Sequence, residues 1–296
     1  MTRSISFKRI SLFFFAICCS THTYAQVYAN AKAPVEDRVK AILAQMTLEE
    51  KLDYIGGYKG FYIRPIQRLG LPEIKLTDGP VGTHKDGRAV AYPASILSAA
   101  TWDTQLITRL GKELGRDSKA RGVHILLAPG VNIVRAPMSG RNFEYFSEDP
   151  FLNSRIGVSY IQGLQGENVV ATVKHYAANN QEWDRNNVSS DIDERTLHEI
   201  YFPAFKAAVQ EAKAGSVMNS YNLVNGVHAT QSGYLNNEIL KGLWGFDGFV
   251  VTDYTSINEL VPHGIAENLA QAGQLAINAG VDMDMVGEGF LNTMKK

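Results

Sequence analysis

The sequence predicts an α/β protein whose architecture is a (β/α)8 TIM-like barrel. Short, continuously apolar runs alternate with segments whose apolar residues recur every three or four positions, the pattern of parallel strands joined by helices. Polar residues follow nearly every apolar run. A site assembled from the ends of many strands favours a barrel over a doubly wound sheet with one nucleotide crevice, and the sequence contains no G-x-G-x-x-G or Walker motif.

Composition and the first 25 residues indicate a secreted globular protein. The chain has 296 residues, of which 45% are hydrophobic and 20% charged, as is typical of a soluble protein with a sizeable core. Three basic residues precede an apolar run from Ile10 to Cys19, and we expect residues 1–25 to be a signal peptide cleaved after Ala25. A membrane anchor needs ~20 apolar residues, about twice this run, so we expect a periplasmic protein with no membrane partner after cleavage.

Cysteine usage and charge exclude several classes of protein. Both cysteines, Cys18 and Cys19, lie in the predicted leader, so the mature chain has no disulfide or cysteine nucleophile; a lipoprotein is a weaker alternative. Removing the leader leaves 26 Lys and Arg (29 minus 3) against 30 Asp and Glu, which does not indicate a nucleic-acid partner. Residues 26–296 contain no linker or repeat, so we expect one barrel domain without a cofactor, and the oligomeric state stays open.

Four segments have the spacing of amphipathic helices. Apolar residues recur from Val35 to Met46, which predicts an outer helix with one buried stripe. Three further helices are expected to begin at capping residues, and the last of them to kink at a proline: Thr47 with Glu50, Asp103, and Asp193 with Pro203.

The apolar runs predict strands that are buried on both faces. Six such runs are present: Ile74–Thr77, Ile125–Ala128, Val169–Val173, Ser216–Met218, Phe249–Val251, and Val281 with Met283. Five of them lead into polar residues: Asp78, Lys174 with His175, Asn219, Asp253, and Asp284. In a barrel the carboxyl ends of the strands share one face, so these polar residues are expected to meet there.

Several of these residues have both a chemical and a structural interpretation. Asp253 leaves an apolar strand beside an aromatic residue, where it could attack an anomeric carbon or simply cap a helix. Asp78 precedes Gly-Pro and could grip sugar hydroxyls or start a turn. Lys174 and His175 could donate to hydroxyls or form structural ion pairs. Arg141 lies in an aromatic and acidic loop and could pair with a glutamate of that loop.

Taken in order, from about Val35 to Met285, these segments resemble the N-terminal barrel of glycoside hydrolase family 3, particularly its periplasmic β-glucosidases. The resemblance is most specific in four segments: Arg141–Pro150, Lys174–Asn180, Ser216–Asn222 and Val250–Tyr254. It implies a retaining mechanism in which Asp253 attacks the anomeric carbon of a β-glucoside or oligosaccharide. It also implies that the following residues bind or line the −1 sugar subsite: Asp78, Arg141, Lys174, His175, Met218 and Tyr221.

Two departures from the family pattern bear on activity. Tyr254 stands where many relatives have tryptophan, which affects the expected leaving-group preference. Two-domain relatives supply a general-acid glutamate from a following α/β sandwich, so we expect this chain to be a fragment that lacks its acid, and the Lys-His-Phe-Pro-Gly-His-Gly sequence of single-domain relatives is not matched either. Since acid assistance is worth ~10²–10⁴-fold, we expect weak turnover of natural glycosides. Normal turnover would instead implicate a glutamate within the chain: Glu144, Glu148 or Glu182.

Three other interpretations stay open. The chain could be a sugar-binding remnant without catalysis, or a β-xylosidase, because glucose and xylose differ by one hydroxymethyl group. A metal-dependent hydrolase would need histidine and aspartate ligands from several strands, although no H-x-H or H-E-x-x-H motif occurs. The residues imagined around such a metal are His84, His124, His175 and Asp253.

Overall fold

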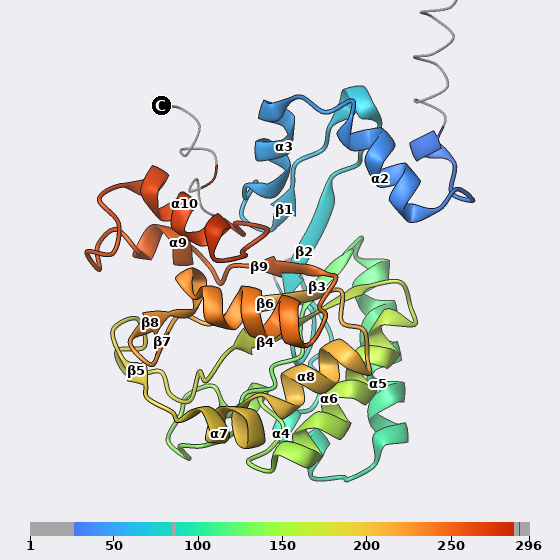
Figure 1. Ribbon diagram of the computed structural model, residues 1–296. Helices are drawn as coiled ribbons and strands as arrows, with labels where there is room; N and C mark the ends of the chain where they lie inside the picture. Colours follow the sequence, from blue (N-terminus) through green and yellow to red (C-terminus); the bar gives the residue numbers. More distant parts are fainter. Residues whose placement is uncertain (1–26, 85–86, 287–289, 291–296) are drawn as a thin grey trace, which may run out of the picture. The chain divides into compact units, whose positions relative to one another are not determined.

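The computed structural model describes residues 27–84, 87–286 and 290 (Figure 1). The predicted signal peptide, with Cys18 and Cys19, lies outside the described residues. The described chain divides into two compact units: residues 27–52 with 66–71, and residues 53–65 together with the chain from residue 72 onward. Among the described helices, none has the length and apolar character needed to cross a membrane.

The first unit contains α2 (Val35–Leu43), the start of α3 (Leu48–Ile55) and a short 3-10 turn, η1 (Gln67–Leu69). The predicted capping box at the start of α3 is confirmed. The Thr47 N–H donates to Glu50 Oε2 at 2.9 Å, and the Glu50 N–H donates to Thr47 Oγ1 at 3.1 Å.

The buried stripe predicted for the first helix is wrong. In α2 the apolar residues Val35, Val39 and Leu43 are 68%, 42% and 44% exposed, and Ala41 is the buried residue of the helix. The described part of this unit consists of short helical pieces, which offer one another too little apolar surface to cover such a stripe. Helical spacing therefore predicted the helix correctly but not its burial.

The second unit is built on a six-stranded sheet with the order β1-β2-β3-β4-β6-β9. Its strands are β1 (Tyr62–Ile63), β2 (Ile74–Asp78), β3 (Ile125–Leu127), β4 (Val170–Tyr176), β6 (Ser216–Asn219) and β9 (Phe249–Val251). All neighbouring pairs are parallel except β1 with β2. A separate three-stranded sheet joins β5 (Ser189–Ser190), β7 (Leu223–Val224) and β8 (Val227–His228).

The main sheet is curled and packs against outer helices, which confirms a TIM-barrel-like α/β fold. Met283 continues the order through a parallel bridge to Val251, and the Asp284 N–H donates to the Ile55 carbonyl at 2.9 Å. A Cβ on Gly57, which lies just after α3, would be 2.6 Å from the Met285 carbonyl oxygen, so glycine is required at this close contact. The described sheet has six strands rather than eight, and the predicted run at Val281 and Met283 forms one bridge and no full strand.

Two apolar layers hold this barrel-like unit together. Side chains from both ends of the curled sheet share the inner cluster: Ile63, Leu76, Ile125, Leu127, Met218, Val251, Met283 and Met285. A larger cluster lies between the sheet and the outer helices. Strands buried by both layers explain why the runs in the sequence are continuously apolar rather than alternating.

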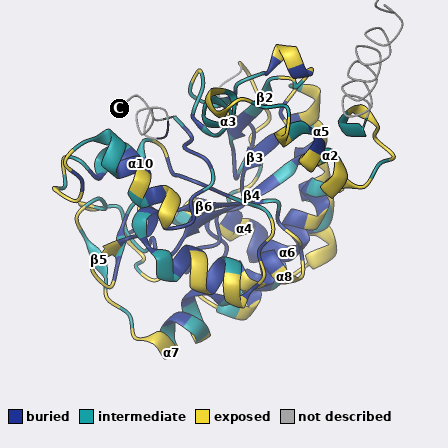
Figure 2. Cartoon of the chain, turned by 45° about the horizontal axis from the view of Figure 1, so that its top comes forward, coloured by how far each residue is buried: buried dark blue, intermediate teal, exposed yellow. Residues whose placement is uncertain are grey.

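The outer helices have one buried and one exposed face (Figure 2). The longest are α5 (Thr104–Ala120), α6 (Pro150–Gln165), α8 (Pro203–Gln210) and α10 (Leu269–Asn278), with a π-helix, η5 (Tyr234–Leu243). Shorter helices are α4 (Ser95–Ala99), η2 (Asn142–Glu144), α7 (Glu194–Thr196), η3 (Leu197–Tyr201), η4 (Ala229–Gln231) and α9 (Ser256–Glu259). The caps predicted at Asp103 and Asp193 are confirmed, and Pro203 interrupts the last predicted helix by starting α8 after a π-helical turn.

Candidate active site

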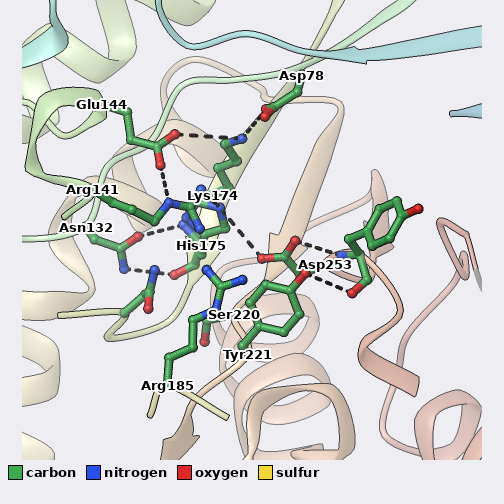
Figure 3. A network of polar contacts seen from close by, with 12 residues as sticks. Asp78, Asn132, Arg141, Glu144, Lys174, His175, Arg185, Ser220, Tyr221 and Asp253 are labelled. Carbon is green, nitrogen blue, oxygen red and sulfur yellow. Dashed lines mark hydrogen bonds and ion pairs between the residues drawn. The ribbon is translucent and has the colours of Figure 1, made fainter. Parts of the chain in front are cut away.

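The structure brings six of the seven predicted binding and catalytic residues into one polar network (Figure 3). Asp78 ends β2, Lys174 and His175 lie near the end of β4, Tyr221 follows β6, and Asp253 follows β9. Arg141 comes from the loop that precedes η2. All of these positions are at the carboxyl ends of strands or in the loops that follow them, which is the face where barrels build their sites.

Met218 is the predicted residue that lies apart from this network. Its side chain is buried on β6 in the inner apolar cluster with Leu76 and Val251. Its predicted role in lining the subsite stays a prediction.

Lys174 is a buried cation held between two carboxylates. Its side chain is 3% exposed, and Nζ donates to Asp78 Oδ1 at 2.5 Å and lies 3.9 Å from Glu144 Oε2. Burial alone would raise the pKa of Asp78, but the Lys174 ammonium outweighs it and holds this pKa below its ordinary value. Asp78 is therefore an ionised carboxylate that can accept hydrogen bonds from hydroxyls. Asp78 Oδ1 also accepts from the Gly79 N–H at 3.1 Å, so the turn-forming interpretation holds as well.

Arg141 lies between Glu144 and His175. Its Nε pairs with Glu144 Oε1, and its Nη2 lies 2.7 Å from His175 Nε2. The ion pair within the loop, expected as the structural alternative, is thus present. Burial alone would lower the pKa of Arg141, but the neighbouring Tyr145 and Glu144 raise it above its ordinary value, so the guanidinium stays charged in the site.

His175 is buried, and its backbone is clamped by Asn132. The His175 N–H donates to Asn132 Oδ1 at 2.7 Å, and Asn132 Nδ2 donates to the His175 carbonyl at 2.9 Å. Burial, together with the charges of Arg141 and Lys174, holds the pKa of His175 well below its ordinary value. The imidazole is therefore neutral at pH 7, and its 3.7 Å approach to Asp253 Oδ2 is not an ion pair.

Asp253 has one pinned oxygen and one oxygen that receives no hydrogen bond from the described residues. Oδ1 accepts from the Tyr254 N–H at 2.7 Å, whereas the buried Oδ2 has no partner. Burial raises the pKa of Asp253, and the charge of Arg141 opposes that rise. The following helix, α9, begins after Thr255, whose side chain makes no capping bond. Asp253 is therefore not a helix cap, and its Oδ2 is available for chemistry.

Tyr221 and an aromatic pair lie beside Asp253. Tyr221 Oη donates to the Tyr254 carbonyl at 2.8 Å. Burial, and then the nearby Asp253 charge, raises the pKa of Tyr221, so its hydroxyl stays protonated. The Tyr254 ring stacks on Phe61 with centroids 5.9 Å apart. An aromatic surface therefore follows the aspartate even though tryptophan is absent.

Sequence reasoning missed four residues of the network: Asn132, Tyr145, Asn179 and Arg185. Arg185 pairs with Glu182 at 2.6 Å and lies 4.2 Å from the Tyr221 ring centroid. Tyr145 lies in the segment Arg141–Pro150 and Asn179 in Lys174–Asn180, so the family resemblance of these segments was the available signal. Asn132 sits in an ordinary apolar stretch and had no signal.

Of the three glutamates considered as an internal acid, two form ion pairs and the third lies in another hollow. Glu144 pairs with Arg141 and approaches Lys174, and Glu182 pairs with Arg185. Glu148 lines a separate hollow with Ile133 and Tyr201.

The residues considered as metal ligands do not form a cluster. His124 precedes β3 at the opposite end of the sheet from His175, and the described residues contain no cluster of three or more His, Cys, Asp or Glu suited to an ion.

Comparisons with known proteins give the family. The family model for the glycosyl hydrolase family 3 N-terminal domain matches residues 63–296, and the chain belongs to this family. It is 42% identical over 259 residues to thermostable beta-glucosidase B of Acetivibrio thermocellus, which covers 83% of this chain and 33% of the relative. It is 44% identical over 248 residues to beta-glucosidase BoGH3A of Bacteroides ovatus, with 79% and 33% covered.

A solved structure shows the same fold. The beta-glucosidase 3B of Thermotoga neapolitana, determined in complex with alpha-D-glucose, has a TM-score of 0.76 and 34% identity over 88% of this chain and 38% of that one. The chain thus spans about a third of the length of the curated relatives it matches.

Proposed function

We propose that this chain is the barrel of a retaining exo-β-glucosidase in which Asp253 forms the covalent glycosyl-enzyme. The proposal rests on Asp253, whose buried Oδ2 receives no hydrogen bond from the part of the chain that the structure describes, while Oδ1 accepts from the Tyr254 N–H. A nucleophile needs such an unencumbered oxygen at a fixed position. The beta-glucosidase names of the relatives supply the substrate class.

The surrounding charges suit such a reaction. Arg141 and Lys174 oppose the effect of burial and favour the ionised, nucleophilic form of Asp253. Asp78, as an ionised carboxylate, can accept hydrogen bonds from two sugar hydroxyls, and Lys174 and Arg141 can donate to others. Attack by Oδ2 on the anomeric carbon then forms an ester and releases the leaving group, and water later cleaves the ester.

We propose that the general acid comes from outside the described residues. Glu144 and Glu182 form ion pairs with arginines, and a proton on either carboxylate would leave its arginine unpaired. Glu148 lies in another hollow. A leaving group that departs without a proton should therefore be released much faster than a sugar alcohol.

The proposed secretion to the periplasm rests on residues 1–25 alone, and N-terminal sequencing of the mature protein tests it.

The test compares three substrates with the isolated chain. We expect release of dinitrophenol from 2,4-dinitrophenyl β-glucoside, at least 10²-fold slower hydrolysis of cellobiose, and slower release from the matching β-xyloside. Asp253→Asn should abolish all release, while Asp247→Asn, a change on the loop before β9, serves as the control. Rapid cellobiose hydrolysis would place the acid within this chain. A faster β-xyloside would favour the xylosidase alternative, and tight glucose binding without release would favour the binding remnant.

A further inference from the structure

A chain of hydrogen bonds runs behind the site from Glu182 to Arg141, and both of its ends have a fixed direction. Glu182 Oε1 accepts from Asn179 Nδ2 at 3.1 Å, and Asn179 Nδ2 also donates to Tyr145 Oη at 2.8 Å. Tyr145 Oη lies 3.2 Å from His175 Nδ1, and His175 Nε2 lies 2.7 Å from Arg141 Nη2. All of these side chains except Glu182 and Arg141 are buried.

The Arg141 end decides which ring nitrogen of His175 carries the proton. A guanidinium has donors and no acceptor, so His175 Nε2 must accept from it through its lone pair. Because the imidazole is neutral, its proton is then on Nδ1. The Nδ1–H group faces Tyr145 Oη, which must act as the acceptor.

The Glu182 end fixes the direction of the two contacts made by Asn179. Glu182 pairs with Arg185, and its Oε1 accepts from the amide nitrogen of Asn179, which therefore faces it. The same nitrogen donates its second proton to Tyr145 Oη. The phenolic oxygen thus accepts from Asn179 as well as from His175, which is compatible with the proton arrangement set at the Arg141 end.

We propose that His175 works in this site as the Nδ1-protonated tautomer, a hydrogen-bond acceptor that positions Arg141, and that Tyr145 is the positioning residue that accepts from its Nδ1–H group. In this state His175 presents no N–H to the sugar, because its Nε2 lone pair holds the guanidinium. The hydroxyl-binding role predicted for His175 then falls to Arg141. Only the catalytic consequence rests on the proposed glycosidase function, because the tautomer exists without substrate.

The direct test is ¹⁵N NMR of the whole chain labelled at histidine, with the His175 signals assigned by their loss in His175→Gln. At pH 7 we expect a protonated Nδ1 and an unprotonated Nε2, and no protonation as the pH falls to about 5. A protonated Nε2, or an imidazolium at pH 7, would overturn the proposal. This readout needs no turnover, so it stands or falls separately from the proposed function.

Tyr145→Phe removes the acceptor of the Nδ1–H group. We expect the His175 Nδ1 and Nε2 shifts to move, and glycosylation by 2,4-dinitrophenyl 2-deoxy-2-fluoro-β-glucoside to slow by about fivefold, the worth of one hydrogen bond. Tyr176→Phe is the matched control: it removes an equally buried hydroxyl, which donates to the Leu235 carbonyl at 3.0 Å in the outer core, and should leave both readouts unchanged. Unchanged shifts and rate in Tyr145→Phe would refute the role of Tyr145. If that variant fails to fold, the wild-type tautomer still decides the matter.

Discussion

At the scale of single residues, the site is a set of charges that compensate one another, of which Lys174 and Glu144 are buried. Lys174, with a side chain 3% exposed, meets Asp78 and Glu144, and Glu144 in turn meets Arg141. Removing one member of such a set leaves a partner buried with an uncompensated charge, which costs more than the intact pair contributes. Because Glu144 is buried, loss of a neighbouring cation destabilises this carboxylate the most.

Lys174→Met should therefore lower the free energy of unfolding by about 3 kcal/mol. The measurement is urea denaturation at pH 7 and low salt. Arg195→Met provides the control, because its pair with Glu199 on the surface is 82% and 59% exposed and should contribute nothing measurable. Equal effects of the two changes would show that Lys174 is not the buried counter-charge described here.

The pKa of Asp253 gives a pH dependence of known sign. Burial raises this pKa, so the rate of glycosylation by the fluorinated glucoside should rise with pH through an inflection above ~3.9, the ordinary value for aspartate. A carboxyl group with a raised pKa in the folded state loses stability as pH rises from its unfolded pKa through its folded pKa. Asp253→Asn should therefore unfold at higher urea concentration than the wild type at pH 7. A rate inflection at or below the ordinary value would contradict this description.

At the scale of elements, close helix packing supports the strands that carry the site. Helices α5 and α6 approach most closely at Gly111 and Gly163, where an added Cβ on Gly163 would lie 2.3 Å from the Thr108 carbonyl oxygen. Gly163→Ala should lower the free energy of unfolding by about 2 kcal/mol, since backbone must move to admit the methyl group. Gly233→Ala is the control, because an added Cβ there would lie 4.0 Å from Asn237 Nδ2 and the φ of Gly233 is −59°. Equal stability of both variants in urea denaturation would contradict the close approach.

The sequence predicted elements well where one physical cause dominates. Continuous apolar runs predicted β2, β3, β4, β6 and β9, because strands covered on both faces need no alternation. Local capping chemistry predicted the helix starts at Thr47, Asp103 and Asp193. The exposed stripe of α2 was missed because periodicity reports an apolar face but not whether a partner covers it.

At the scale of the whole molecule, the curling of one parallel sheet is the feature that assembles the site and that the sequence could not specify. Asp78 and Asp253 are 175 positions apart in the numbering, yet both join the Lys174 network because β2 and β9 lie in one curled sheet. The hydrogen bond between Asp284 and Ile55, at the end of α3, likewise has no local pattern in the sequence. The same is true of Asn132 and Tyr145, whose importance comes from His175 in a distant strand.

The central claim is that Asp253 is the nucleophile, and covalent trapping tests it most directly. The chain is incubated with 2,4-dinitrophenyl 2-deoxy-2-fluoro-β-glucoside, whose leaving group needs little acid assistance, and is then analysed by intact-protein mass spectrometry and peptide mapping. We predict a single added deoxyfluoroglucosyl group on Asp253, and none in Asp253→Asn. Folded wild-type chain that remains unmodified, or an adduct on any other residue, would contradict the claim.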